Sequence, residues 1–149
     1  MATGAPPVPR PDYEEQRLAL GFGLGWPEIV ALDARIRPEP RVAIGTWFGI
    51  NGGGKEAPIY SMPMGYVRWY LEGSRDAPFF QFGAGSRIKG LFGGDPLSAS
   101  PLIMATYGYE WRWAHGVTVS GDIGGIFDFS LAGTSPVFRG GLRVGYLLL

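Results

Sequence analysis

The segment from residue 137 to residue 148 alternates strictly between apolar side chains and small or charged side chains. One set contains Phe138, Gly140, Leu142, Val144, Tyr146 and Leu148, and the other contains Arg139, Gly141, Arg143 and Gly145. Successive side chains of a β-strand project to opposite faces, so this period of two predicts a strand with one apolar and one polar face. The pattern recurs from Leu18 almost to the end of the chain. It predicts a sheet whose two faces meet different surroundings.

Eight segments carry this alternation, and turn-forming residues separate them. Pro, Gly, Asn and Asp cluster between the segments, as in residues 37–40 and 51–54, and these residue types favour turns. Residues 28–37 carry a weak helical period, but they alternate equally well, and we interpret them as a strand. The expected strands are residues 17–25, 28–37, 41–50, 59–71, 79–89, 102–113, 116–128 and 137–148.

The composition is unusual for a water-soluble domain. Charged residues make up only 17% of the 149 residues, and 11 of the 13 basic residues are Arg. An average soluble domain is about 25% charged, and its surface is covered largely by Lys and Glu. The formal net charge is zero, which gives no reason to expect nucleic-acid binding.

The chain length and the residue types set the domain organisation. The length is typical of one domain, and we expect a flexible leader at 1–16, rich in Pro and charge, followed by a barrel domain at 17–149. There is no cysteine, and no apolar run approaches the roughly 18 residues of a spanning helix. The first residues lack the pattern of a signal peptide, so we expect a mature form with an added initiator Met.

Alternation alone leaves open which face meets which solvent. A soluble lipocalin-like carrier also alternates, with charges outside and apolar residues around a ligand. Here the polar face is mostly Gly, Ala, Ser and Thr, which suits the narrow lumen of an eight-stranded barrel. Aromatic residues also gather near strand ends, as in the girdles at two membrane interfaces. The expected interface residues are Trp26, Trp47, Trp69, Phe80, Trp111, Trp113, Phe127, Phe129, Phe138 and Tyr146.

These observations predict an all-β, eight-stranded, antiparallel, up-and-down transmembrane β-barrel. Connections alternate between the two ends of such a barrel, and outer loops are usually the longer ones. We therefore expect residues 51–58, 90–100 and 130–136 to be outer loops that meet external partners. A soluble ligand carrier remains the alternative fold and function.

The charged residues on the polar face are candidates for a network in the lumen. They are Asp33, Arg35, Arg68, Arg87, Glu110, Arg112, Asp122, Asp128, Arg139 and Arg143. A charge buried in a narrow barrel must be paired, because an uncompensated one costs several kcal/mol. We expect an ion-pair plug, with Glu110, Arg112, Asp122, Arg139 and Arg143 as one network. A narrow ion pore lined by the same residues is the alternative.

The pattern resembles the small eight-stranded bacterial outer-membrane barrels, the class that includes the OmpA transmembrane domain, OmpX and the opacity proteins. The resemblance covers residues 17–148, and residues 141–148 resemble the C-terminal assembly signal of that class. It implies a bacterial outer-membrane location, contact with the lipid bilayer and recognition by the barrel-assembly machinery through the C-terminal strand. We expect a monomer without a cofactor, in a structural or surface-interaction role.

Few residues suggest catalysis. His115 is the only histidine, and Ser120 lies five residues later. Outer-membrane lipid A deacylases resemble this chain in barrel type, but their His and Ser lie two apart on one strand face. A spacing of five puts the two residues on opposite faces. One His without Cys also argues against a transition-metal site. We expect no enzymatic activity, with a lipid A-modifying enzyme as the alternative.

Overall fold

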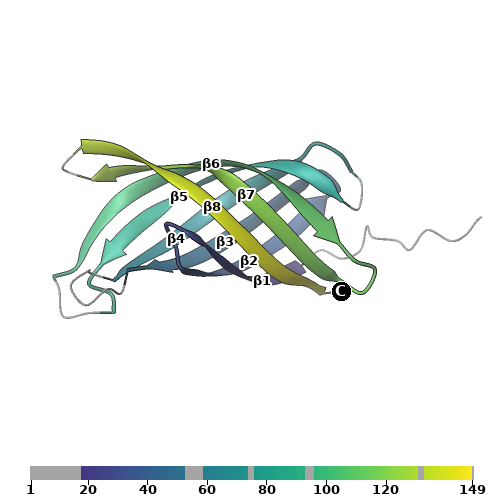
Figure 1. Cartoon of the computed structure of the whole chain (residues 1–149), viewed down its shortest axis with the longest axis horizontal. Helices are drawn as coiled ribbons and strands as arrows, with labels where there is room; N and C mark the ends of the chain where they lie inside the picture. Colours follow the sequence, from purple (N-terminus) through teal and green to yellow (C-terminus); the bar gives the residue numbers. More distant parts are fainter. Residues whose placement is uncertain (1–17, 53–58, 74–75, 93–95, 131–132, 149) are drawn as a thin grey trace, which may run out of the picture.

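The computed structural model describes residues 18–52, 59–73, 76–92, 96–130 and 133–148, which form one barrel (Figure 1). Every strand pairs antiparallel with its neighbours in sequence, and β1 pairs with β8, so the sheet closes on itself. Among the described residues no helix is long and apolar enough to cross a membrane. The strands are β1 (Leu18–Trp26), β2 (Val30–Glu39), β3 (Val42–Asn51), β4 (Tyr60–Tyr70), β5 (Ala77–Lys89), β6 (Ser98–Arg112), β7 (Val117–Ser130) and β8 (Gly133–Leu148).

The expected all-β barrel with eight antiparallel strands is confirmed, and the alternation sorts its side chains. On β6, exposed and buried residues alternate along the strand, with Ile103 and Trp111 outside and Met104 and Glu110 inside. This alternation follows from the pleat of the β-strand, which directs neighbouring side chains to opposite faces. Every second residue of a strand is therefore buried in the narrow lumen, and the apolar residues between them face outward.

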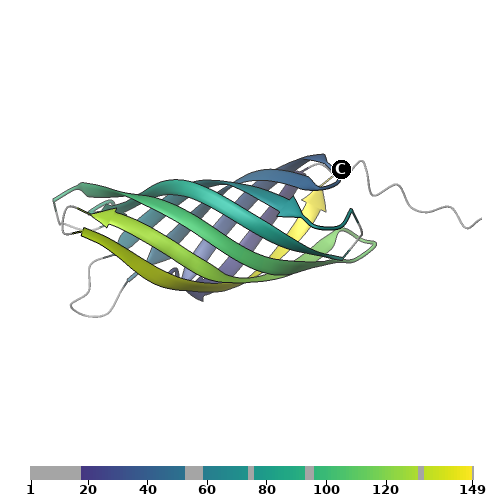
Figure 2. The same cartoon turned by 90° about the horizontal axis from the view of Figure 1, so that it is seen from above.

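The strands cross the barrel obliquely, as Figures 1 and 2 show. Leu148 of β8 pairs with Leu18 of β1, and the line of cross-strand partners can be followed from there through β2 to β7. This line returns to β8 at Phe138, which is ten residues before Leu148. A stagger of ten residues over eight strands requires tilted strands, in the range of about 35–45° that closed barrels adopt. This tilt leaves a lumen wide enough only for side chains.

β6 and β8 each begin four residues earlier than expected, β5 begins at Ala77 rather than residue 79, and two expected loops are corrected. β6 begins at Ser98 rather than residue 102, and β8 begins at Gly133 rather than residue 137. Most of the expected loop 130–136 and the end of loop 90–100 are therefore strand. Pro101 and Pro136 suggested turns, yet a proline fits a strand where its missing N–H is not needed. The expected leader 1–16 and residues 53–58 of the first outer loop lie outside the described residues.

The two ends of the barrel differ in shape. The end that carries the β2–β3, β4–β5 and β6–β7 connections is even, whereas the other rim is slanted. β1 ends at Trp26, which pairs with Gly140, and β8 continues for seven further residues to Gly133. Figure 1 shows the β1–β2 hairpin ending part-way along the barrel. The rim is therefore lowest at β1–β2 and rises around the barrel to β8.

Candidate functional site: the lumen and the outer surface

The outer face of the barrel is covered by large apolar side chains. Leu24, Leu32, Phe82, Ile123 and Leu142 each expose more than half of their surface, and they come from five different strands. Soluble monomers rarely expose a continuous apolar patch of more than a few hundred Å². A band that encircles the molecule requires an apolar solvent, and this face is the one that meets lipid.

Nine of the ten expected interface aromatics lie on this outer face and are exposed. Trp69, Phe80, Trp111, Trp113 and Tyr146 lie near the even end of the barrel, and Trp26, Phe127, Phe129 and Phe138 lie toward the slanted rim. This placement forms two girdles separated by aliphatic residues. Aromatic rings prefer the two membrane–water interfaces, so the girdles mark the depth of the barrel in a bilayer.

Trp47 is the exception, and its expected place at the interface is wrong. Its side chain is only 1% exposed and points into the lumen. The parity of β3 explains this, because Ile44 and Thr46 face outward and Trp47 takes the opposite face. Gly49 leaves the room that the indole fills, and the Arg139 guanidinium lies 5.2 Å from the Trp47 ring.

In the lumen, Glu110 of β6 is the centre of one charge cluster. Its carboxylate binds Arg35 Nη2 at 2.7 Å, Arg68 Nη1 at 2.6 Å and Arg112 Nε at 2.6 Å. The Tyr70 hydroxyl donates a fourth hydrogen bond to Glu110 at 3.1 Å. All these side chains are buried. Three guanidiniums from three strands thus share a single carboxylate.

Asp122 of β7 is the centre of a second cluster. Its Oδ2 accepts hydrogen bonds from Arg139 Nη1 and from Arg143 Nη2, the latter at 3.4 Å. Arg139 also donates from Nη2 to Glu28 Oε1 at 2.7 Å. Glu28 is not among the expected residues, because the parity of the expected strand 28–37 gives it the outward face of Val30. β2 begins at Val30 rather than residue 28, so Glu28 lies in the connection between β1 and β2, and its side chain is buried.

Gln81 of β5 joins the two clusters. Its Oε1 accepts from Arg68 Nε at 3.0 Å and from Arg143 Nη1 at 3.3 Å. The five residues expected in one network are therefore divided between two carboxylates and linked through an amide. Nearby, Tyr66 donates to Asp33 Oδ2 at 2.7 Å. The inward parity of β5 could have identified Gln81, but its partners depend on register across the lumen.

Arg87 and Asp128 form a third pair, near the slanted rim. Arg87 Nη1 lies 2.6 Å from Asp128 Oδ2, and the Arg87 side chain remains 35% exposed. Among the described residues, no hydrogen bond or ion pair joins this pair to the two clusters below it. The ten expected charges thus occupy different depths of the lumen rather than one site.

A buried apolar cluster separates the Arg87–Asp128 pair from the deeper charges. It consists of Ala31, Trp47, Met62, Met64, Tyr66, Leu102, Met104 and Ile126. From the slanted rim downward, the inward residues on β4 include Tyr60, Met62, Met64, Tyr66 and Arg68. Those on β6 include Ser100, Leu102, Met104, Thr106 and Glu110. The same order of polar, apolar and charged residues on both strands divides the lumen into three layers.

Glycines on the lumen side make room for the large side chains. A Cβ placed on Gly45 would come within 2.5 Å of the Tyr66 ring, and one on Gly108 would come equally close to Phe79. Such a contact cannot occur without a shift of the ring. The small residues that first indicated a narrow lumen therefore alternate with the bulky ones that fill it.

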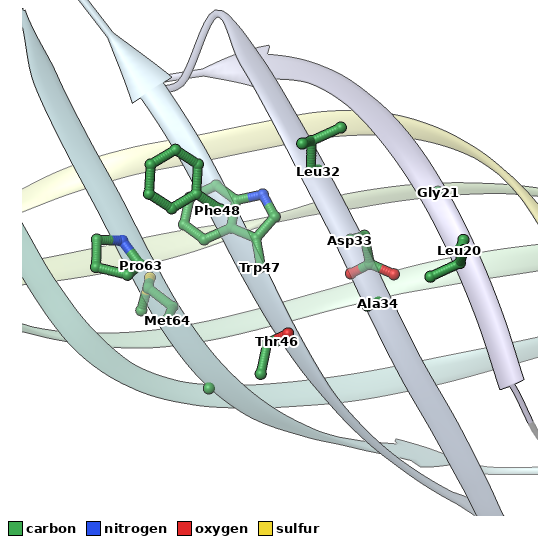
Figure 3. Close-up of a pocket in the computed structure, with 11 residues that line it drawn as sticks. Leu20, Gly21, Leu32, Asp33, Ala34, Thr46, Trp47, Phe48, Pro63 and Met64 are labelled. Atoms are coloured by element: carbon green, nitrogen blue, oxygen red, sulfur yellow. The ribbon is translucent and has the colours of Figure 1, made fainter. Parts of the chain in front are cut away.

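The outer wall carries a hollow of about 660 Å³ across β1 to β4 (Figure 3). The outward residues Ala34, Thr46 and Gly65 pair in register across β2, β3 and β4 and form its shallow centre. Leu32, Phe48 and Pro63, which pair in the same way, border it. In a bilayer, this apolar hollow meets acyl chains.

The residues considered for catalysis do not come together. His115 is exposed in the connection between β6 and β7, whereas Ser120 is buried on the lumen side of β7. The described part of the chain also contains no group of three His, Cys, Asp or Glu residues that could hold a metal ion.

Two solved structures have the same architecture. The N-terminal β-barrel domain of Pseudomonas aeruginosa OprF is 10% identical, with a TM-score of 0.54 over 89% of this chain and 96% of that one. The chain has the fold of a small transmembrane β-barrel. A de novo designed transmembrane β-barrel is 12% identical, with a TM-score of 0.50 over 88% of this chain and 92% of that one. No family model and no curated protein matches the sequence.

The membrane location of this transmembrane β-barrel follows from its surface as well as its fold. The apolar band and its two aromatic girdles surround the barrel, and the ionic groups are turned inward. A soluble lipocalin-like carrier requires the opposite arrangement, with charges outside and an apolar cavity. The barrel is therefore a membrane protein.

Proposed function

We propose that this barrel is an integral protein of the bacterial outer membrane whose lumen is plugged by its own side chains. Its role is then to support the membrane or to bind partners at the cell surface, rather than to transport solutes. The observation that carries the proposal is the buried apolar cluster between two polar layers, in which Met62, Met64 and Met104 expose at most 3% of their surface. An ion crossing this layer would lose its water without gaining a polar partner, which is costly.

The ion-paired clusters support the same proposal. Arg35, Arg68 and Arg112 meet on Glu110, so these four buried side chains bind one another and fill the lumen at this depth. Arg is suited to this task, because its planar fork binds carboxylates through several hydrogen bonds at once. The alternative function, a narrow ion pore, would need these pairs and the apolar layer to open together.

Planar-bilayer recording of the refolded barrel separates the two functions. We expect no steady conductance from the wild type. The matched test is a variant with Met64→Ser and Met104→Ser, which makes the apolar layer polar and smaller and should raise the frequency of openings. Steady unitary currents from the wild type, with ion selectivity that changes in Glu110→Gln, would instead establish the pore.

We further propose that the barrel is not an enzyme and needs no cofactor. The exposed position of His115 and the inward position of Ser120 support this, because a nucleophile needs its base within hydrogen-bond reach. Mass spectrometry of lipid A from cells that express the wild type or His115→Ala tests it. We expect identical spectra, and a mass change that depends on His115 would establish a lipid-modifying activity.

The proposed orientation places the slanted rim outside the cell and the even end in the periplasm. The two longest connections, residues 52–59 and 90–97, lie at the slanted rim and support it, since the outer loops of such barrels are usually longer than the periplasmic turns. The chain contains no cysteine, so single cysteines can report exposure. In intact cells, a membrane-impermeant maleimide should label Phe92→Cys and not His115→Cys. The reverse labelling pattern would invert the orientation.

The proposed partners are the lipid bilayer and the barrel-assembly machinery, which would recognise β8. We also propose a monomer. Truncation of the chain after Tyr146 tests the role of β8, because it removes the pairs of Leu147 with Ala19 and of Leu148 with Leu18 that help to close the barrel. We expect the shortened chain to accumulate outside the outer membrane, and normal assembly would contradict this role.

A further inference from the structure

A polar hollow of about 300 Å³ lies at the slanted mouth of the barrel, above the apolar layer. Its lining comes from the upper ends of β4 to β7. Arg87 pairs with Ser100 across the sheet, and Lys89 pairs with Ser98 and with Tyr60, so five lining residues lie on adjacent positions. Ser130 of β7 completes the wall.

The chemistry of this lining is that of an anion site. Arg87 and Lys89 bring two positive charges into a small hollow, and three serines add hydroxyl donors. Asp128 Oδ2 lies 2.6 Å from Nη1 of the Arg87 guanidinium, and the Arg87 side chain is partly exposed. A guanidinium has five N–H donors and an ammonium has three, so both can bind an anion while they keep another contact. A phosphate group fits such donors well.

One further group favours a sugar beside the anion. The Tyr60 ring lines the hollow, and its centroid lies 4.9 Å from the Arg87 guanidinium. An aromatic ring offers apolar surface to a sugar, and inorganic phosphate has no apolar part to use it.

The slanted rim gives this hollow a sideways opening. In a ring of eight strands, β5 and β6 lie opposite β1 and β2, where the wall is lowest. Trp26 and Ile29, at the end of the β1–β2 hairpin, are both more than half exposed and mark the level of the membrane surface. The hollow therefore faces the headgroup region across the lowest part of the rim.

We propose that the mouth of the barrel binds a phosphorylated sugar, with Arg87 and Lys89 on the phosphate and Tyr60 and the serines on the sugar. The ligand is either the headgroup of a glycolipid or a free sugar phosphate. This inference deepens the proposed surface-interaction role. It depends on the proposed orientation only for the glycolipid, because the free ligand can be tested in detergent.

Calorimetric titration of the refolded barrel in a zwitterionic detergent is the first test. Glucose 1-phosphate should bind saturably at roughly millimolar concentration, and glucose and inorganic phosphate should each bind at least about tenfold more weakly. No saturable binding of glucose 1-phosphate would overturn the proposal. Equal binding of inorganic phosphate would overturn its sugar part.

Substitutions then locate the site. Arg87→Gln should weaken binding at least about tenfold, and Arg87→Lys, which keeps the charge and loses the fork, should weaken it less. The matched control is Arg41→Gln, which removes the same charge from an exposed position at the even end. Ser100→Ala tests the site without disturbing the Arg87–Asp128 pair. Equal losses of affinity in Arg87→Gln and Arg41→Gln would show that only the net charge matters and would overturn the proposed site.

Vesicles distinguish the two sources of the ligand. Barrels reconstituted in phosphatidylcholine alone, or with added monophosphoryl lipid A, are titrated with glucose 1-phosphate. If the headgroup is the ligand, the glycolipid should compete and abolish the titration for the wild type. If the titration is unchanged, the free sugar phosphate is the ligand. The conductance experiment is independent of both arms, so this proposal can fail while the plugged lumen stands.

Discussion

Arg139 donates a hydrogen bond from Nη2 to Glu28 Oε1 at 2.7 Å and so joins two residues that are 111 apart in the sequence. Both side chains are buried. Arg139 lies next to Gly140, whose pairing with Trp26 is the last between β1 and β8, and Glu28 lies two residues beyond Trp26. The ion pair therefore continues the closure of the barrel one step past the end of the backbone ladder.

Glu28→Ala should destabilise the barrel by about 1–3 kcal/mol, because a buried guanidinium loses one of its two acceptors. The loss is limited, since Arg139 still donates to Asp122. Urea unfolding in lipid vesicles measures the change. Glu39→Ala, at an exposed position at the end of β2, is the control and should change little. Equal stability of the two variants would show that the pair does not hold the seam.

Glu110→Gln should have a larger effect, about 3–5 kcal/mol, because three buried guanidiniums lose their shared charge. The amide keeps the shape of the side chain, so the loss reports charge rather than packing. The unfolding midpoint in urea, compared with that of Glu39→Gln, measures it. A midpoint equal to that of the wild type would mean that the cluster is compensated in another way.

Gly45→Ala should destabilise the barrel by about 1–3 kcal/mol through overpacking, since the new Cβ would meet the Tyr66 ring. Gly65→Ala is the matched control, because a Cβ there meets nothing within 4 Å. Equilibrium unfolding of both variants gives the comparison. If both alanine variants are equally stable, the Tyr66 ring is not packed tightly against Gly45.

Trp47 should be shielded from lipid, unlike the other four tryptophans, which are on the outer face. A variant that keeps only Trp47, with Phe at the other four positions, should show little fluorescence quenching by brominated lipids. A variant that keeps only Trp69 should be strongly quenched. Equal quenching of the two variants would show that Trp47 contacts lipid at the interface. Iodide in the buffer should quench neither strongly.

The strands and their faces could be predicted because they depend on local periodicity. The alternation in residues 137–148 assigned Arg139 and Arg143 to one face, and no partner strand is needed for that. The parity of β3 places Trp47 inside the barrel, and its aromatic character alone suggests the interface. The early starts of β6 and β8 could not be predicted, because Pro101 and Pro136 indicate turns in the sequence. Their pairing with β5 and β7 shows that both prolines lie in strands.

By itself, the sequence determined the number of strands, the closed two-faced sheet and the kind of residue on each face. The tertiary structure alone decided which charges meet. The stagger of ten residues brings Arg68 and Arg143 to the same oxygen of Gln81, and no local pattern encodes that stagger. It also decided the role of Glu28, which lies in a turn without parity. Periodicity is a property of neighbouring residues, whereas register is fixed only when every strand has found its partner.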